Sequence, residues 1–169
     1  MVLLKEITAE EFPCSPFPLI GNEWMLISAE KDNKVNSMTA SWGGLGVMWN
    51  KNVAYIVIRN SRFTKQFVDA SEMFSLTFFD HDKYLKMYQY MGSVSGRDED
   101  KIVTSGLTLS YNEKVPYFTE ASLVMICRKL CCQPISPDSF SVDSIQTSFY
   151  EDRDYHNLYI GEIVKFLSV

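Results

Sequence analysis

The chain has 169 residues, of which 46% are hydrophobic and 22% are charged, a balance that is ordinary for one soluble globular domain. Its net charge of −5 excludes a general attraction to nucleic acid or anionic lipid, although a local pair of basic residues can still bind a phosphate. No apolar window approaches the roughly 20 residues that span a bilayer, and residues 1–11 do not resemble a signal peptide. We therefore expect a cytoplasmic protein with no membrane and no nucleic-acid partner.

The four cysteines form no C-x-x-C pair, and the chain has only two histidines. The sequence therefore predicts no metal site. Cys127, Cys131 and Cys132 fall in a segment with strand character, where free cysteine commonly acts as a small apolar residue. That interpretation is favoured over a redox role for these thiols.

The first third of the chain predicts extended structure. Residues 2–7 form a short extended start, and the three prolines in residues 12–18 predict an extended arm with no helix. Residues 24–29 have the composition of a strand, and the polar residues 30–34 form a turn. That turn delivers the chain into residues 36–50.

The segment 36–50 combines three glycines with hydroxyl and tryptophan side chains. Thr39 and Ser41 could face a planar, polar-edged ligand, because glycine allows close approach of the backbone. The alternative is a glycine-rich hairpin whose tryptophans cap the core, and both interpretations stay open on composition. We expect Trp42 near a ligand and Trp49 in the core or at a dimer interface.

The middle of the chain alternates strands with helices. Residues 53–59 are β-branched and aromatic, which is typical of a buried strand. A helix opens within residues 60–64, with Ser61 as the expected N-cap. Residues 74–79 predict a strand, and residues 82–91 predict a helix with an apolar stripe that packs on the core.

The last part of the chain is dominated by two long strands. A polar loop, residues 92–101, runs into a short helix and then a strand or turn at residues 106–111. Residues 122–132 and 155–167 predict the long strands, and residues 139–145 predict a loop or short helix between them. Together these elements predict one domain, residues 1–169, of the mainly β class. We expect an antiparallel β-barrel with inserted helices.

Three polar segments are candidate ligand sites. The strand-to-helix junction at residues 59–64 suits a phosphate, because a helix N-terminus offers free N–H groups beside Ser61, Thr64 and two arginines. A plain capped helix with surface arginines would have the same sequence. Residues 95–101 could equally be a solvated turn, and His156 could orient a ligand, transfer a proton or be a structural histidine.

No dinucleotide fingerprint, P-loop or nucleophile motif occurs in the chain. An enzymatic reaction would therefore depend on a bound cofactor for its chemistry.

Taken together and in this order, the 36–49, 59–64, 95–101 and 155–163 segments resemble the flavin reductase-like, FMN-binding split-barrel family, in its flavoredoxin-like branch. The resemblance covers about residues 16–165. It implies a split β-barrel homodimer with one FMN per protomer at or near the dimer interface. It also implies hydride transfer from NADH or NADPH to the flavin, with no covalent or acid–base protein catalyst required.

The resemblance implies three groups of cofactor-binding residues. The first lines the isoalloxazine ring and ribityl chain: Asn36, Met38, Thr39, Ala40, Ser41 and Trp42. The second lies near the phosphate: Arg59, Ser61, Arg62 and Thr64. The third closes over the ligand: Ser95, Arg97 and Lys101. His156 is a candidate neighbour of the flavin or the nicotinamide.

Three functions compete at this point. The first is an NAD(P)H-dependent flavin reductase. The second is an FMN electron carrier that a redox partner protein reduces. In the third, the protein binds no flavin and is a structural β-barrel module that dimerises through the glycine-rich segment.

Overall fold

A computed structural model describes residues 3–12 and 14–169 of the chain. In chain order the elements are β1 (Lys5–Ile7), α1 (Pro16–Gly21), β2 (Met25–Lys31), β3 (Lys34–Ala40), β4 (Gly43–Met48), β5 (Lys51–Arg59), α2 (Phe63–Ala70), β6 (Met73–Phe78), α3 (His81–Ser93), α4 (Lys101–Ser105), β7 (Leu109–Asn112), β8 (Val115–Phe118), β9 (Leu123–Pro134), η1 (Pro137–Ser139), α5 (Asp143–Phe149) and β10 (His156–Ser168). The predicted class, mainly antiparallel β structure with inserted helices, is confirmed.

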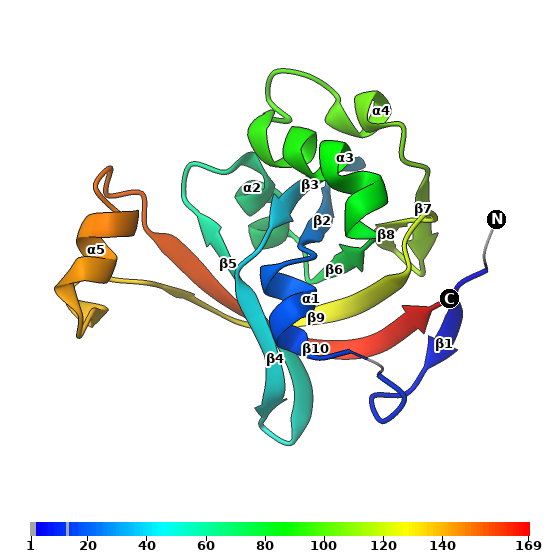
Figure 1. Ribbon diagram of the computed structural model, residues 1–169, viewed down its shortest axis with the longest axis horizontal. Coiled ribbons are helices and arrows are strands. Elements are labelled where there is room, and N and C mark those ends of the chain that lie inside the picture. Colours follow the sequence, from blue (N-terminus) through cyan, green and yellow to red (C-terminus); the bar gives the residue numbers. More distant parts are fainter. Residues whose placement is uncertain (1–2, 13) are drawn as a thin grey trace.

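The main sheet is antiparallel and has the strand order β3-β2-β6-β9-β10-β5-β4, with β1 added along β10. Its two ends in this order, β3 and β4, are consecutive in the chain and are joined by only Ser41 and Trp42. Because so short a link connects opposite ends of the order, the sheet must curl until these ends meet. Figure 1 shows β4 running on from β3 along one side of the curled sheet.

The long strand β9 separates two hydrophobic clusters. Leu123, Met125 and Cys127 face the first cluster, and Val124 and Ile126 face the second. This alternation is the one that the sequence predicts, since successive side chains of a strand point to opposite faces. The second cluster lies against α3, whose predicted apolar stripe is confirmed by the burial of Met87, Tyr88 and Met91.

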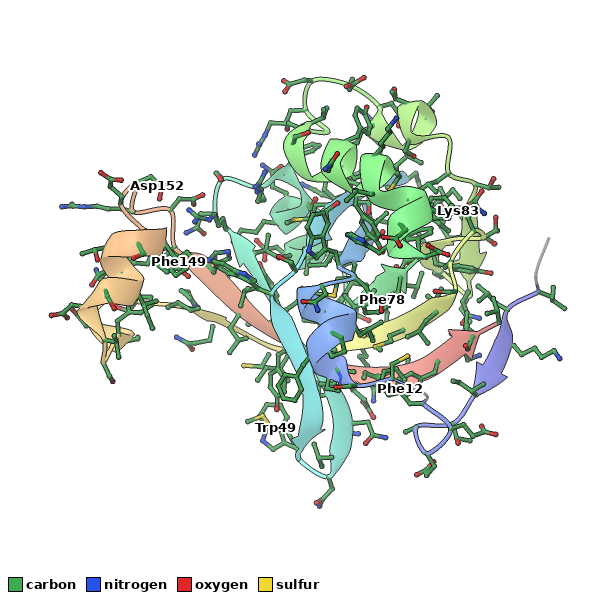
Figure 2. The ribbon with its side chains drawn as sticks, in the orientation of Figure 1. Phe12, Trp49, Phe78, Lys83, Phe149 and Asp152 are labelled. Atoms are coloured by element: carbon green, nitrogen blue, oxygen red, sulfur yellow. The ribbon has the colours of Figure 1, made fainter. Side chains whose placement is uncertain are left out.

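Residues 36–50 do not form a hairpin by themselves, so the alternative interpretation of this segment as a glycine-rich hairpin is wrong. Their first part is β3, which pairs with β2, and their second part is β4, which pairs with β5. Trp49 and Asn50 form the β4–β5 turn with φ of 53° and 55°, the positive values that a type I′ turn needs. Trp49 is 55% exposed there and is not in the core (Figure 2).

The glycines of β4 make room for Tyr55 on β5. Gly43 has φ of 154°, and a Cβ at this position would overlap the Tyr55 carbonyl oxygen. A Cβ on Gly46 would lie 3.4 Å from the Tyr55 ring. Close packing on the neighbouring strand therefore explains why this segment is rich in glycine.

Two predictions of helix position are wrong. Residues 12–18 are predicted to contain no helix, but Pro16 and Pro18 fall in the first turn of α1, where the backbone N–H groups have no helical partner and proline is tolerated. Residue 13 of this predicted proline-rich segment and residue 2 of the predicted extended start lie outside the described residues. Ser61 is not the N-cap of α2, which is Arg62 without a side-chain capping bond.

Residues 135–155, between β9 and β10, form what we call the arm. It carries η1 and α5 and projects from the body at the left of Figure 1. No residue of α5 is buried. The other helices α2, α3 and α4 lie over the β2–β3 end of the sheet, on the opposite side of β5 from the arm.

The cysteines agree with the strand interpretation in part. Cys127 is fully buried on β9, whereas Cys131 is half-buried and Cys132 is exposed on the same strand. In the described ranges, 3–12 and 14–169, no three His, Cys, Asp or Glu side chains gather as metal ligands would. The helices in these ranges are all too short or too polar to cross a bilayer.

Candidate functional site

Two neighbouring hollows lie along β3, and Met38 and Arg62 line both of them. The first, here called the cation-lined hollow, has a volume of about 110 Å³ and includes the predicted residues Asn36, Met38, Ser61, Arg62, Thr64, Ser95, Arg97 and Lys101. The second, the aromatic hollow, has about 170 Å³ and includes Met38, Thr39, Ala40, Ser41, Trp42, Arg59, Arg62 and His156. Each is smaller than the roughly 300 Å³ at which small-molecule pockets begin, so a cofactor-sized ligand would extend beyond either hollow alone.

Three cations of the first hollow have no acidic partner in the described residues. Lys101 donates to the carbonyls of Met91 and Val94 at 2.8 and 3.0 Å. Arg62 donates to the Gly92 carbonyl, and Arg97 donates to the Ser61 carbonyl and lies over the Phe63 ring. A cluster of like charge whose hydrogen-bond acceptors are carbonyl oxygens is a favourable place for an anion to bind.

The electrostatics of Lys101 agree with this interpretation. Its side chain is buried, with 4% exposure. Burial, followed by the nearby Arg62 charge, lowers the pKa of Lys101 to about 8. An anion bound in the hollow would offset both causes and favour the charged ammonium.

The polar floor of the cation-lined hollow is built by β3 and α2. The Asn36 side-chain amide donates to the Thr64 hydroxyl at 2.7 Å in a buried contact. Gly96 lies directly against the Asn36 amide, and a Cβ there would overlap the amide oxygen. The loop after α3 can therefore close down on β3 only because residue 96 is glycine.

The arm occupies part of the strand-to-helix junction. Asp154 accepts hydrogen bonds from the Ser61 backbone N–H at 3.1 Å and the Ser61 hydroxyl at 2.5 Å. Arg59 pairs with Asp152 at 3.2 Å and donates to the Phe149 carbonyl at 2.7 Å. Figure 2 shows Phe149 and Asp152 on the arm, facing the junction. The carboxylates of Asp152 and Asp154 thus occupy groups of Arg59 and Ser61 that would otherwise be available to an external anion.

The aromatic hollow is framed by Trp42 and His156. The Trp42 ring lies 5.3 Å from the rings of both Phe149 and His156. Thr39 donates its hydroxyl to the Tyr88 carbonyl at 2.6 Å, which fixes β3 on α3. Flat apolar faces beside polar groups suit a planar ligand with a polar edge.

His156 is neutral in this setting. It is 8% exposed, and its Nδ1 atom lies 2.8 Å from the Tyr150 hydroxyl. Burial, and then the positive charge of Arg59, lower its pKa to about 4, against an opposing effect of Asp154. A group with this pKa cannot serve as a proton donor near neutral pH.

Every predicted site residue thus lines one of the two hollows. Arg59 is the residue whose position differs from the prediction: it lines the aromatic hollow with residues 38–42, apart from the cation-lined hollow. Sequence reasoning missed Tyr150, Asp152 and Asp154. Their contacts span up to 95 residues, and no local motif marks them.

A curled antiparallel sheet with a cation-lined hollow at a strand-to-helix junction defines a small ligand-binding split β-barrel. The chain belongs to the flavin reductase-like domain family, whose model matches residues 19–168. The predicted family is therefore confirmed. No curated protein sequence matches the chain.

Solved structures share the fold. Flavoredoxin from Methanosarcina acetivorans is 22% identical, with a TM-score of 0.67 over 87% of this chain and 68% of its own. The FMN-binding domain of a flavin reductase-like enzyme from Shewanella baltica is 17% identical, with a TM-score of 0.71 over 98% and 77%. Flavoredoxin of Desulfovibrio vulgaris is 21% identical, with a TM-score of 0.66 over 96% and 75%. The predicted split-barrel fold is confirmed by this similarity.

Proposed function

We propose that this protein is an FMN-binding oxidoreductase that accepts hydride from NADH or NADPH. The observation that carries the proposal is the cluster of Arg62, Arg97 and Lys101, which lacks an acidic partner in the described residues, next to a hollow with flat aromatic walls. An FMN molecule has matching parts: a phosphate for the cations and a planar ring for the aromatic hollow. FMN-binding relatives by name and fold support the same cofactor.

The residues would divide the work by chemistry. Arg62, Arg97 and Lys101 hold the phosphate through charge-assisted hydrogen bonds, which are stronger than neutral ones. Thr39, Ala40 and Ser41 present the β3 end to the ring, and Trp42 covers it from one side. Bound FMN would supply the redox chemistry by taking two electrons from the nicotinamide and passing them to an acceptor. The protein binds, orients and shields the ring.

The second candidate is an FMN electron carrier that a partner protein reduces. The flavoredoxins among the fold relatives favour it. In the carrier, FMN stays bound and NADH or NADPH does not reduce it. In the reductase, NADH or NADPH reduces the flavin directly.

A spectrum and a rapid-mixing experiment separate these functions. We expect the protein, incubated with FMN and desalted, to show oxidised flavin bands that bleach on anaerobic stopped-flow mixing with NADH or NADPH. Retained FMN that neither nucleotide bleaches would favour the carrier. A protein that neither retains FMN nor changes FMN fluorescence in a titration would contradict both and favour the structural β-barrel module.

We also propose that the protein is a homodimer whose arm contacts the second copy. The arm projects from the body, and Val142, Ile145 and Phe149 on it are exposed by 52%, 43% and 47%. An exposed apolar helix face of this kind is typical of an association surface. The aromatic hollow lies beside the arm, so a partner bound there would also cover the site.

Replacing Ile145 with aspartate should weaken this dimer, because a charge would enter an apolar contact. We expect the dimer dissociation constant to rise at least about tenfold, since roughly 1.4 kcal/mol is lost for each factor of ten. Sedimentation velocity over a concentration series measures it. Val103→Asp is the control, because Val103 is an exposed valine on α4 away from the arm. A wild-type protein that stays monomeric throughout the concentration series would disprove the dimer.

A further inference from the structure

We propose that Tyr150 is a positioning residue that holds His156 as a hydrogen-bond donor, with its Nε2–H presented to a carbonyl oxygen of the ligand in the aromatic hollow. The inference has two parts: the donor half is that Tyr150 holds His156 as a hydrogen-bond donor, and the ligand half is that a carbonyl oxygen of the ligand accepts this hydrogen bond. The donor half concerns the protein alone. The ligand half rests on the proposed function, because the planar ring of a flavin carries carbonyl oxygens on its polar edge.

Tyr150 is held firmly against His156. Its hydroxyl oxygen lies 2.8 Å from Nδ1, and the two rings meet edge to face at 85°. The other face of Tyr150 stacks on Tyr155, with ring centroids 4.9 Å apart and planes 16° apart. The Arg59 guanidinium lies 5.4 Å from the Tyr150 ring centroid. With only 7% of its surface exposed, Tyr150 has little freedom to turn away.

The direction of the hydrogen bond follows from the partners of each group. Burial raises the pKa of the Tyr150 hydroxyl, which therefore keeps its proton. Among the described residues this hydroxyl has no acceptor other than Nδ1. If Nδ1 carried the ring proton, both groups would be donors and the phenol proton would be left unpaired at a buried site, which costs free energy. Tyr150 therefore donates to Nδ1.

The tautomer of His156 is then fixed. A neutral imidazole has one N–H, and with Nδ1 accepting, the proton lies on Nε2. The charged groups facing the ring are Arg59 and Arg62, which oppose protonation, and Asp154, which favours it. Burial also opposes protonation, and because burial and the two arginines outweigh Asp154, the ring stays neutral. Nε2 has no partner among the described residues and is not sealed from solvent, and His156 lines the aromatic hollow. Its N–H is therefore available to a ligand that accepts a hydrogen bond in this hollow.

Nitrogen-15 NMR of the FMN-free protein tests the donor half. The chain has two histidines, so histidine-labelled protein gives two imidazole patterns, and His81→Asn assigns them. We expect His156 to show an unprotonated Nδ1 and a protonated Nε2 at pH 7, with no titration above about pH 5. In Tyr150→Phe we expect a mixture of tautomers. Tyr155→Phe, which removes a hydroxyl from the same stack, should leave the pattern unchanged.

Flavin titrations test the ligand half. Loss of one neutral hydrogen bond should weaken binding about two- to tenfold, and Tyr150→Phe should weaken FMN and riboflavin equally, because the phosphate groups are untouched. A protonated Nδ1 in the wild type, or an unchanged tautomer in Tyr150→Phe, would overturn the positioning role. A changed tautomer with unchanged riboflavin affinity would overturn the ligand half. A wild type that binds no flavin at all would reject the proposed function, while the NMR result would still decide the role of Tyr150.

Discussion

Arg62→Ala should weaken FMN binding by about 10- to 150-fold, because charge-assisted hydrogen bonds contribute roughly 1.5–3 kcal/mol. Arg62 lines both hollows and has only the Gly92 carbonyl as a partner in the described residues. Its charge also lowers the pKa of the buried Lys101. Isothermal titration of the variant with FMN measures the loss.

Riboflavin makes this experiment specific, because it has the ring and the ribityl chain without the phosphate. Arg62→Ala should leave riboflavin affinity nearly unchanged. The ratio of FMN affinity to riboflavin affinity should therefore fall by the same factor as the FMN affinity. Arg128→Ala is the matched control: it also removes one arginine, but Arg128 pairs with Glu162 on the sheet. Equal losses for both flavins in Arg62→Ala would mean that Arg62 supports the ring and the phosphate lies elsewhere.

Gly161→Ala should destabilise the protein by about 1–3 kcal/mol, the usual cost of adding a group to a well-packed core. Gly161 is on β10 at a register shift against β9. A Cβ there would lie 2.7 Å from Cζ of Phe74 and 3.1 Å from Cβ of Cys127, and both neighbours are buried. For a chain of this length the melting temperature should fall by roughly 2–4 °C per kcal/mol. Thermal and urea unfolding monitored by circular dichroism measure both quantities.

Two further variants test the cause of this loss. A Cβ at Gly21, at the end of α1, would meet no atom within 4 Å, so Gly21→Ala should leave stability nearly unchanged. Phe74→Leu should relieve the overlap, and the double variant should therefore lose less than the two single losses added together. Additive losses would show that the overlap with Phe74 is not the cause.

The sequence predicts most strands well, because strands depend on local patterns. The residues that line the hollows follow instead from the resemblance of four ordered segments to one family. The alternation along β9 places its apolar side chains on the correct faces, and the β-branched run of β5 marks a central strand. The site residues lie in four short segments that the fold brings together. Ser95, for example, lies two residues after the end of α3 and lines the same hollow as residues of β3 and α2.

What the sequence misses depends on contacts between distant segments. Ser61 has the composition of an N-cap, but its hydroxyl donates to Asp154, which local propensity cannot foresee. Arg59 carries a charge suited to phosphate, yet Asp152 on the arm pairs with it. Proline disrupts the interior of a helix, so the sequence predicts no helix at Pro16 and Pro18, whereas both fall in the first turn of α1, where proline is tolerated.

The two-residue link between β3 and β4 has a consequence for folding. Five strands stand between β3 and β4 in the sheet order, and two of them, β9 and β10, come from the last third of the chain. The β2–β3 and β4–β5 hairpins can form early from local contacts, but the sheet cannot curl shut until β9 and β10 have entered its centre. Because long-range pairing is intrinsically slow, we expect closure of the sheet at a late stage of folding. Ser41 and Trp42, which link the two hairpins, should then be among the last residues to reach their final geometry.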